Sequence, residues 1–248
     1  MDYSGITQKY YANWLGVSSD VMYQNGISLV KSPQREICQK SYPAKLDLYV
    51  FIQDERVIIS YCDKTENNLS KLLKDIKTGD KPEHMFSVIK AAYCVSPNQN
   101  IKFVFHHLEH NDTMVKELTI NDYPLFLRFF LANNPNSKNT DWLYEYFQRI
   151  VEKRYSYGMI IDNLLVAATD APFMPYMENE VQEIGINTLK EYRGKGYAKA
   201  VCIAAINSLL KQNICPLWST MAGNIASERL AYSIGFKKYA EILTVSIK

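Results

Sequence analysis

Two glycines in a basic run are the residues best suited to bind a charged ligand. Residues 193–198 read RGKGYA, and Lys199 follows directly. Glycine tolerates positive φ angles and lets a ligand approach backbone N–H groups closely. If a helix begins here, its first N–H groups lack intrahelical partners, and the helix dipole adds positive potential. These residue types at this spacing predict a pyrophosphate site.

Two common phosphate-binding motifs do not fit this run. A dinucleotide fingerprint requires G-x-G-x-x-G, and Lys199 stands three residues after Gly196. A Walker motif requires G-x-x-x-x-G-K-[ST], which is absent from the sequence. Taken alone, the run could also be an ordinary solvated helix cap, so its context must decide.

The surrounding sequence predicts that the run joins a strand to a helix. The elements expected in the second half of the chain, from apolar periodicity and turn residues, are strands at 115–119, 155–161, 164–169, 181–188, 217–221 and 236–247, and helices at 123–132, 142–153, 196–212 and 225–234. Asn121 is the expected cap of the first helix, and Thr140 or Asp141 that of the second.

A second motif follows the run and makes the pattern specific. The two together resemble the GNAT superfamily of acyl-CoA-dependent N-acyltransferases. Its pattern [QR]-x-x-G-x-[GA] is matched by Arg193, Gly196 and Ala198. Its second pattern, an asparagine followed by a helix that ends in Gly-Phe, is matched by Asn224 and residues 235–236. The resemblance extends from about residue 114 to the end, just over half of the chain.

The resemblance implies an α/β (α+β) fold in two parts. Residues 112–248 would form the GNAT acyltransferase domain, a mixed, splayed β-sheet flanked by helices. Residues 1–111 would form a smaller α/β accessory domain, as in the branch of the superfamily with an extra N-terminal domain. Within it we expect a hairpin at 46–62, helices at 67–77 and 83–93, and a strand at 101–107. This part is either a degenerate GNAT-like half or an unrelated cap that walls the acceptor site.

The resemblance also implies the co-substrate and the residues that bind it. The co-substrate would be acetyl-CoA or another acyl-CoA, with no metal. Three groups of residues would hold it: the pantetheine arm would pair with the backbone of Ile186, Asn187 and Thr188, the pyrophosphate would lie on Arg193, Gly194, Lys195, Gly196, Tyr197 and Ala198, and Asn224 and Ser227 would hold the pantetheine end.

Glu183 is the candidate catalytic base. It stands on the splaying strand where many family members place a carboxylate, and partial burial would raise its pKa toward neutrality. The alternative is a carboxylate that faces solvent or pairs with a lysine.

Many relatives protonate the leaving thiolate with a tyrosine four residues before the Gly-Phe pair, but Ala231 occupies that position. Tyr232 is one residue away, about 100° around the helix, and is a weak substitute.

Composition limits the other classes of function. The chain has 248 residues, 47% hydrophobic and 22% charged, with a net charge of +2, so it can bury a core and lacks the basic surface of a nucleic-acid-binding protein. Its five cysteines suggest reduced thiols rather than a disulfide framework. Neither a secretory signal nor an apolar stretch of about 20 residues is present, which favours a cytoplasmic protein without membrane contact.

Two further features leave alternatives open. His106, His107 and His110, with Glu109 and Asp112, are the only histidine cluster, but neighbouring strand residues face opposite ways and would not share a metal. The loop at 171–179, rich in proline, methionine and aromatic residues, either shapes an acceptor pocket or fills an interdomain seam.

Three functions follow, in decreasing order of support. The first is an N-acetyltransferase that transfers an acetyl or other acyl group to a primary amine of a small molecule or peptide by direct attack. The second is a non-catalytic acyl-CoA-binding or regulatory protein, consistent with Ala231. The third, an enzyme that uses aminoacyl-tRNA, is disfavoured by the near-neutral charge.

Overall fold

The computed structural model describes residues 1–39, 42–108 and 115–247. Within these ranges the α-helices are α1 Tyr3–Leu15, α2 Asp63–Glu66, α3 Leu69–Asp75, α4 Pro82–Tyr93, α5 Tyr123–Asn133, α6 Asp141–Glu152, α7 Tyr197–Lys211 and α8 Ile225–Ser233. The strands are β1 Gly26–Lys31, β2 Leu48–Gln53, β3 Arg56–Tyr61, β4 Asn98–Phe105, β5 Lys116–Glu117, β6 Tyr157–Ile161, β7 Leu164–Asp170, β8 Val181–Glu183, β9 Gly185–Thr188, β10 Cys215–Met221 and β11 Phe236–Val245. No helix in these ranges is long and apolar enough to cross a bilayer.

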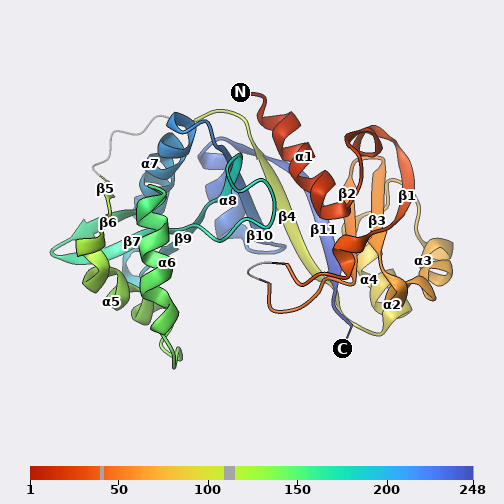
Figure 1. The fold of residues 1–248 in the computed structure, drawn as a ribbon, viewed down its shortest axis with the longest axis horizontal. Helices are drawn as coiled ribbons and strands as arrows, with labels where there is room; N and C mark the ends of the chain where they lie inside the picture. Colours follow the sequence, from red (N-terminus) through yellow and green to blue (C-terminus); the bar gives the residue numbers. More distant parts are fainter. Residues whose placement is uncertain (40–41, 109–114, 248) are drawn as a thin grey trace.

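The strands form two sheets. The larger has the order β1-β3-β2-β11-β4-β10-β8, and the smaller has the order β5-β6-β7-β9. Figure 1 shows β1 to β3 at one end of the long axis, β5 to β7 at the other, and β4, β10 and β11 between them. The expected α/β fold with a mixed, splayed sheet and flanking helices is confirmed.

One strand from the first half of the chain is built into the second half. β4 pairs antiparallel with both β10 and β11, and β11 continues past it to pair with β2. A single sheet therefore crosses the expected division between residues 111 and 112, which itself lies outside the described residues. The two-domain division, and the idea that the first part is a degenerate GNAT-like half, stay predictions.

Three hydrophobic clusters form the core of the described residues. One cluster packs α1 against the central strands, with Tyr11, Trp14 and Leu15 buried beneath the helix. A second packs α3 and α4 against the hairpin strands, where Leu72 and Ile89 are buried. The third and largest joins α5, α6, α7 and α8 to the β6–β7 sheet and to β10. The sheet is therefore covered by helices along its whole length.

Local sequence explains most of these elements, and four expectations need correction. The hairpin turn at Asp162 and Asn163 forms as predicted, with φ of 48° and 59°. α5 is not capped by Asn121; the preceding 3-10 turn begins at Thr119, whose backbone N–H donates to Asp122 at 2.8 Å. The expected strand at 181–188 is two strands, and α1 and β1 were not predicted.

The fourth correction concerns the histidines. His106 and His107 follow the last residue of β4, so strand alternation does not separate them, and their Nδ1 atoms lie 3.2 Å apart. His110, Glu109 and Asp112 lie outside the described residues. The described residues contain no group of three or more potential metal ligands. All five cysteines lie within the described ranges and are free thiols.

Candidate active site

A cleft of about 720 Å³ lies where the two sheets separate. Its walls come from β8, β9, β10, and the first turns of α7 and α8. The predicted site residues that line it are Glu183, Ile186, Asn187, Thr188, Arg193, Gly194, Gly196, Tyr197, Ala198, Asn224 and Ser227. Of the predicted set, only Lys195 is absent from the lining. Residues more than forty positions apart thus meet around one space.

A bend at Ile184 opens this cleft. β8 pairs parallel with β10, and the backbone N–H of Ile184 makes one more bond to the Leu217 carbonyl, 3.0 Å long. From Gly185 onward the chain pairs with β7 instead. The edge of β9 that faces β10 therefore has no strand partner among the described residues.

Hydrogen-bond alternation decides which β9 groups face the cleft. The backbone N–H of Leu189 donates to the Val166 carbonyl, which belongs to the β7 side. In an antiparallel pair the bonded residues alternate, so Asn187 also turns its backbone toward β7. Ile186 and Thr188 turn theirs toward the cleft. An extended ligand can therefore pair with these two residues, while Asn187 offers its side chain.

The glycine turn presents unpaired N–H groups to the cleft. Gly194 and Gly196 have φ of 75° and 81°, in the region that favours glycine. Gly196 is the N-cap of α7, and no side chain among the described residues caps that helix. Nothing lies within 4 Å of the position a Cβ would take at either glycine. The turn is thus an open, positively polarised cradle.

The basic side chains of the turn serve it in different ways. Arg193 Nε donates to the Thr188 carbonyl at 3.1 Å, which fastens the turn to the end of β9. Lys195 Nζ lies over the Tyr192 ring, 4.9 Å from its centre. Arg193 therefore holds the shape of the cradle, and Lys195 contributes charge from outside the cleft.

The opposite wall is the first turn of α8. Asn224 is the N-cap, and its Oδ1 accepts from the backbone N–H of Ser227 at 3.3 Å. Ser227 Oγ lies 3.2 Å from Trp218 Nε1, which donates to it. Both predicted side chains thus line the cleft and also hold the helix end in place.

Glu183 lines the cleft and belongs to a polar row across three strands. Its Oε1 accepts a 2.7 Å hydrogen bond from Ser219 Oγ on β10. Ser219 is directly opposite Lys102 of β4. Burial lowers the pKa of Lys102, and the nearby Glu183 carboxylate opposes that shift. Glu183 is half-buried and therefore not fully solvated. Among the described residues, no lysine lies within salt-bridge distance of its carboxylate.

The charge of Glu183 acts on two buried tyrosines from the first half of the chain. Burial raises the pKa of Tyr10, on α1, well above its usual value, and the Glu183 charge raises it further. The same two causes act on Tyr42. Both phenols therefore stay neutral at physiological pH. The N-terminal part thus contributes Lys102 and neutral hydroxyl groups to the surroundings of Glu183.

The α8 residues offer no tyrosine to the cleft. Ala231 is fully buried. Tyr232 is 49% exposed, and its ring contacts Phe103 at 5.5 Å between centres. Neither residue lines the cleft. One step along the helix therefore places Tyr232 outside the site.

Ser219 lines the site and Lys102 stands opposite it on β4, but neither was predicted. No motif contains them, because strand register rather than sequence proximity brings them near Glu183. The only signal available was the sequence of the strands themselves, which does not specify their partners.

Comparisons with known proteins agree with this architecture. Residues 131–243 match the family described as GNAT acetyltransferase. An acetyltransferase of the GNAT family from Colwellia psychrerythraea is similar in structure, with a TM-score of 0.52 and 19% identity over 61% of this chain and 56% of that one. A GNAT-family protein from Novosphingobium aromaticivorans has a TM-score of 0.46 and 24% identity over 60% and 63% of the two chains. No curated protein matches.

These similarities have a limited extent. The matched regions span less than two thirds of each of the two structures. At such identities the likeness concerns the fold alone. The family match itself assigns residues 131–243 of this chain to the GNAT acetyltransferase family.

Proposed function

We propose that the protein is an acyl-CoA-dependent N-acyltransferase that transfers an acetyl group to a primary amine by direct attack. The observation that carries this proposal is the single cleft that joins the glycine turn, the free edge of β9 and Glu183. When bound, acetyl-CoA supplies an activated acyl group as a thioester. The cleft of about 720 Å³ is large enough for an extended cofactor arm of that kind.

The residues present suit such a co-substrate. The amides of residues 194–198 and the helix dipole of α7 would bind the pyrophosphate. The outward backbone groups of Ile186 and Thr188 would bind the pantetheine amides as an added strand would. Asn224 and Ser227 would border the pantetheine end. The thioester would then lie near the bend at Ile184, within the same cleft as Glu183.

Glu183 would act as the base. An amine must be neutral to attack a carbonyl carbon, so a nearby carboxylate that accepts its proton lowers the barrier. Ser219 donates to one carboxylate oxygen and leaves the other for the amine. Because Ala231 and Tyr232 offer no hydroxyl to the cleft, the leaving thiolate would take its proton from solvent or from another hydroxyl of the lining, such as Tyr192 or Tyr197.

One observation favours a second function. The absence of a tyrosine at position 231 also suits a protein that binds acyl-CoA without turnover. Purified protein should be incubated with acetyl-CoA and a pool of primary amines, with release of free thiol as the readout. Amine-dependent thiol release supports the transferase. Tight binding of CoA by calorimetry without thiol release supports the second function instead.

A further inference from the structure

A second cavity, which we call the aromatic pocket, adjoins the cleft. It measures about 540 Å³ and is walled by α5, α6, the end of β7, the following loop and one residue of β9. Asp170 and Asn187 line both spaces. The pocket therefore adjoins the cleft that Glu183 also lines.

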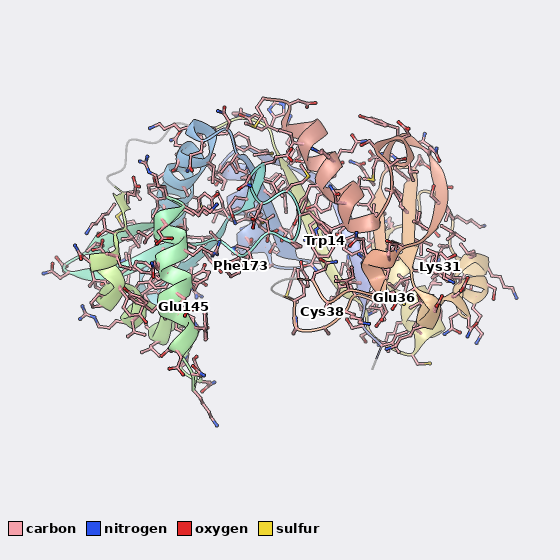
Figure 2. All side chains as sticks on the ribbon, in the orientation of Figure 1. Trp14, Lys31, Glu36, Cys38, Glu145 and Phe173 are labelled. Atoms are coloured by element: carbon pink, nitrogen blue, oxygen red, sulfur yellow. The ribbon has the colours of Figure 1, made fainter. Side chains whose placement is uncertain are left out.

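The pocket wall is dominated by aromatic rings. Those that line it are Phe126, Phe129, Phe130, Trp142, Tyr146 and Phe173. Phe126 and Phe129 are buried, whereas Trp142 is 49% exposed at the rim. Figure 2 shows Phe173 in the loop beside α6, which itself bears Glu145. A flat or bulky apolar group fits such a wall.

The charges of the lining are negative. Asp170 stands at the junction with the cleft, and Glu145 is exposed on α6. No lysine, arginine or histidine is among the described lining residues. Arg149 lies behind the wall, with its guanidinium stacked on the Phe173 ring at 3.9 Å and donating to the Ala171 carbonyl. The pocket thus favours a cationic group over an anionic one.

Asp170 is held in place by its neighbours. The Tyr146 hydroxyl donates to Asp170 Oδ1 and accepts from the Ala171 backbone N–H at 3.0 Å. Opposite Asp170 in the sheet is Gly185, where an added Cβ would approach the Asp170 Cβ at 3.0 Å. The missing side chain leaves room for the carboxylate at the mouth of the cleft, where its second oxygen can accept from a ligand.

We infer that the aromatic pocket binds the acceptor, and that the acceptor is a small primary amine with an aryl or similarly bulky apolar group. The apolar group would fill the space among the rings, and the ammonium would pair with Asp170 at the junction. From there the amine is beside the cleft that the proposed function assigns to the acyl group. This inference rests on that proposed function and adds the class of acceptor. Polyamines and carboxylate-bearing amines fit the pocket poorly.

Direct binding tests the pocket without relying on turnover. Titration of the wild-type protein with 2-phenylethylamine should give saturable binding by calorimetry, at least about tenfold tighter than 1,4-diaminobutane or phenylalanine. Trp142→Ala should weaken 2-phenylethylamine by about tenfold and leave the affinity for CoA unchanged. Tyr144→Ala is the matched control, because Tyr144 is an exposed ring on the same helix that does not line the pocket.

A second variant tests the charge. Asp170→Asn keeps an oxygen for the Tyr146 hydroxyl and should weaken 2-phenylethylamine by about tenfold, with little change for the uncharged 2-phenylethanol. Equal losses for the two ligands would overturn the ion pair.

The outcomes separate this inference from the proposed function. If the protein binds CoA and acetylates other amines but neither binds nor acetylates 2-phenylethylamine, the inference is wrong and the proposed function stands. If 2-phenylethylamine binds in a Trp142-dependent way but CoA does not bind, the pocket stands and the proposed function is wrong.

Discussion

The cleft and the aromatic pocket adjoin but are built from different parts of the chain. The cleft is mostly backbone: two left-handed glycines, a helix N-terminus and an unpaired strand edge. The pocket is mostly side chains, contributed by two helices, two strands and a loop. A site made of backbone groups keeps its ligand when most side chains change, but loses it when a required glycine is replaced. A site made of side chains changes its ligand preference when one ring is replaced. The cleft therefore suits a constant co-substrate, and the pocket suits a selected acceptor.

The largest expected effect concerns a glycine that serves folding rather than the ligand. At Gly235 an added Cβ would lie 1.5 Å from the His107 carbonyl oxygen, and φ is 94°. Gly235→Ala should cost more than about 4 kcal/mol in the free energy of unfolding, measured in urea. Gly223→Ala, with φ of 85° and no atom within 4 Å, should cost only about 1–2 kcal/mol. Equal losses would show that the close approach of the His107 carbonyl is not what requires Gly235.

The cleft itself is tested at Gly196. Gly196→Leu would place a side chain in the open space above the helix N-terminus, so CoA affinity should fall at least about a hundredfold by calorimetry. Gly26→Leu is the control for backbone strain, because Gly26 also has positive φ and open space but lies on β1, outside the cleft. Unchanged CoA affinity in Gly196→Leu would show that the glycine turn does not bind the co-substrate.

Glu183 tests whether the junction of the two regions performs chemistry. Glu183→Gln keeps a hydrogen-bond acceptor for Ser219 but cannot take a proton, so kcat should fall at least about tenfold with little change in CoA affinity. Glu180→Gln is the control, an exposed carboxylate three residues earlier that does not line the cleft. Full activity of Glu183→Gln at every pH between 6 and 9 would exclude it as the base.

The smallest expected effect concerns the helix that carries three rings of the pocket. Burial raises the pKa of Asp122, but hydrogen bonds from Lys116 and Thr119 outweigh it and leave that pKa below its usual value. A depressed folded-state pKa contributes stability above about pH 4 that is lost as the pH falls further. Asp122→Asn should therefore cost about 1–2 kcal/mol at pH 7.

The pH dependence adds a sharper test of the same helix. The free energy of unfolding of wild-type protein, measured in urea, should fall below about pH 4. In Asp122→Asn this fall should be smaller, because the titrating carboxyl group is absent. Asp141→Asn, in the exposed first turn of α6, should retain that decline. A wild-type decline that Asp122→Asn leaves intact would contradict the assignment.

Several elements could be predicted because their signals are local. The hairpin of β2 and β3 follows from two strand-forming runs and a short turn. α7 follows from small apolar residues after a glycine. α1 and β1 were missed, because α1 mixes aromatic and polar residues without a clear apolar stripe, and β1 is an edge strand that gains its order by pairing with β3.

The sequence by itself predicted the glycine turn and the resemblance to the GNAT family. Arg193, Gly194, Gly196 and the first turn of α7 are neighbours in the chain, so their geometry depends on φ angles and bonds within a few residues. The Asn224 cap is equally local. Such contacts join residues within a few positions of one another, which is why a short pattern predicted the turn that lines the cleft.

Only the tertiary structure decided what faces the cradle. The row of Glu183, Ser219 and Lys102 depends on the register of three strands, one of them from the first half of the chain. The aromatic pocket depends on how α5 and α6 pack beside Asp170. Strand partners and helix packing are set by burial summed over the whole fold rather than by any one segment. The aromatic pocket is therefore encoded by long-range packing, and the glycine turn by local backbone geometry.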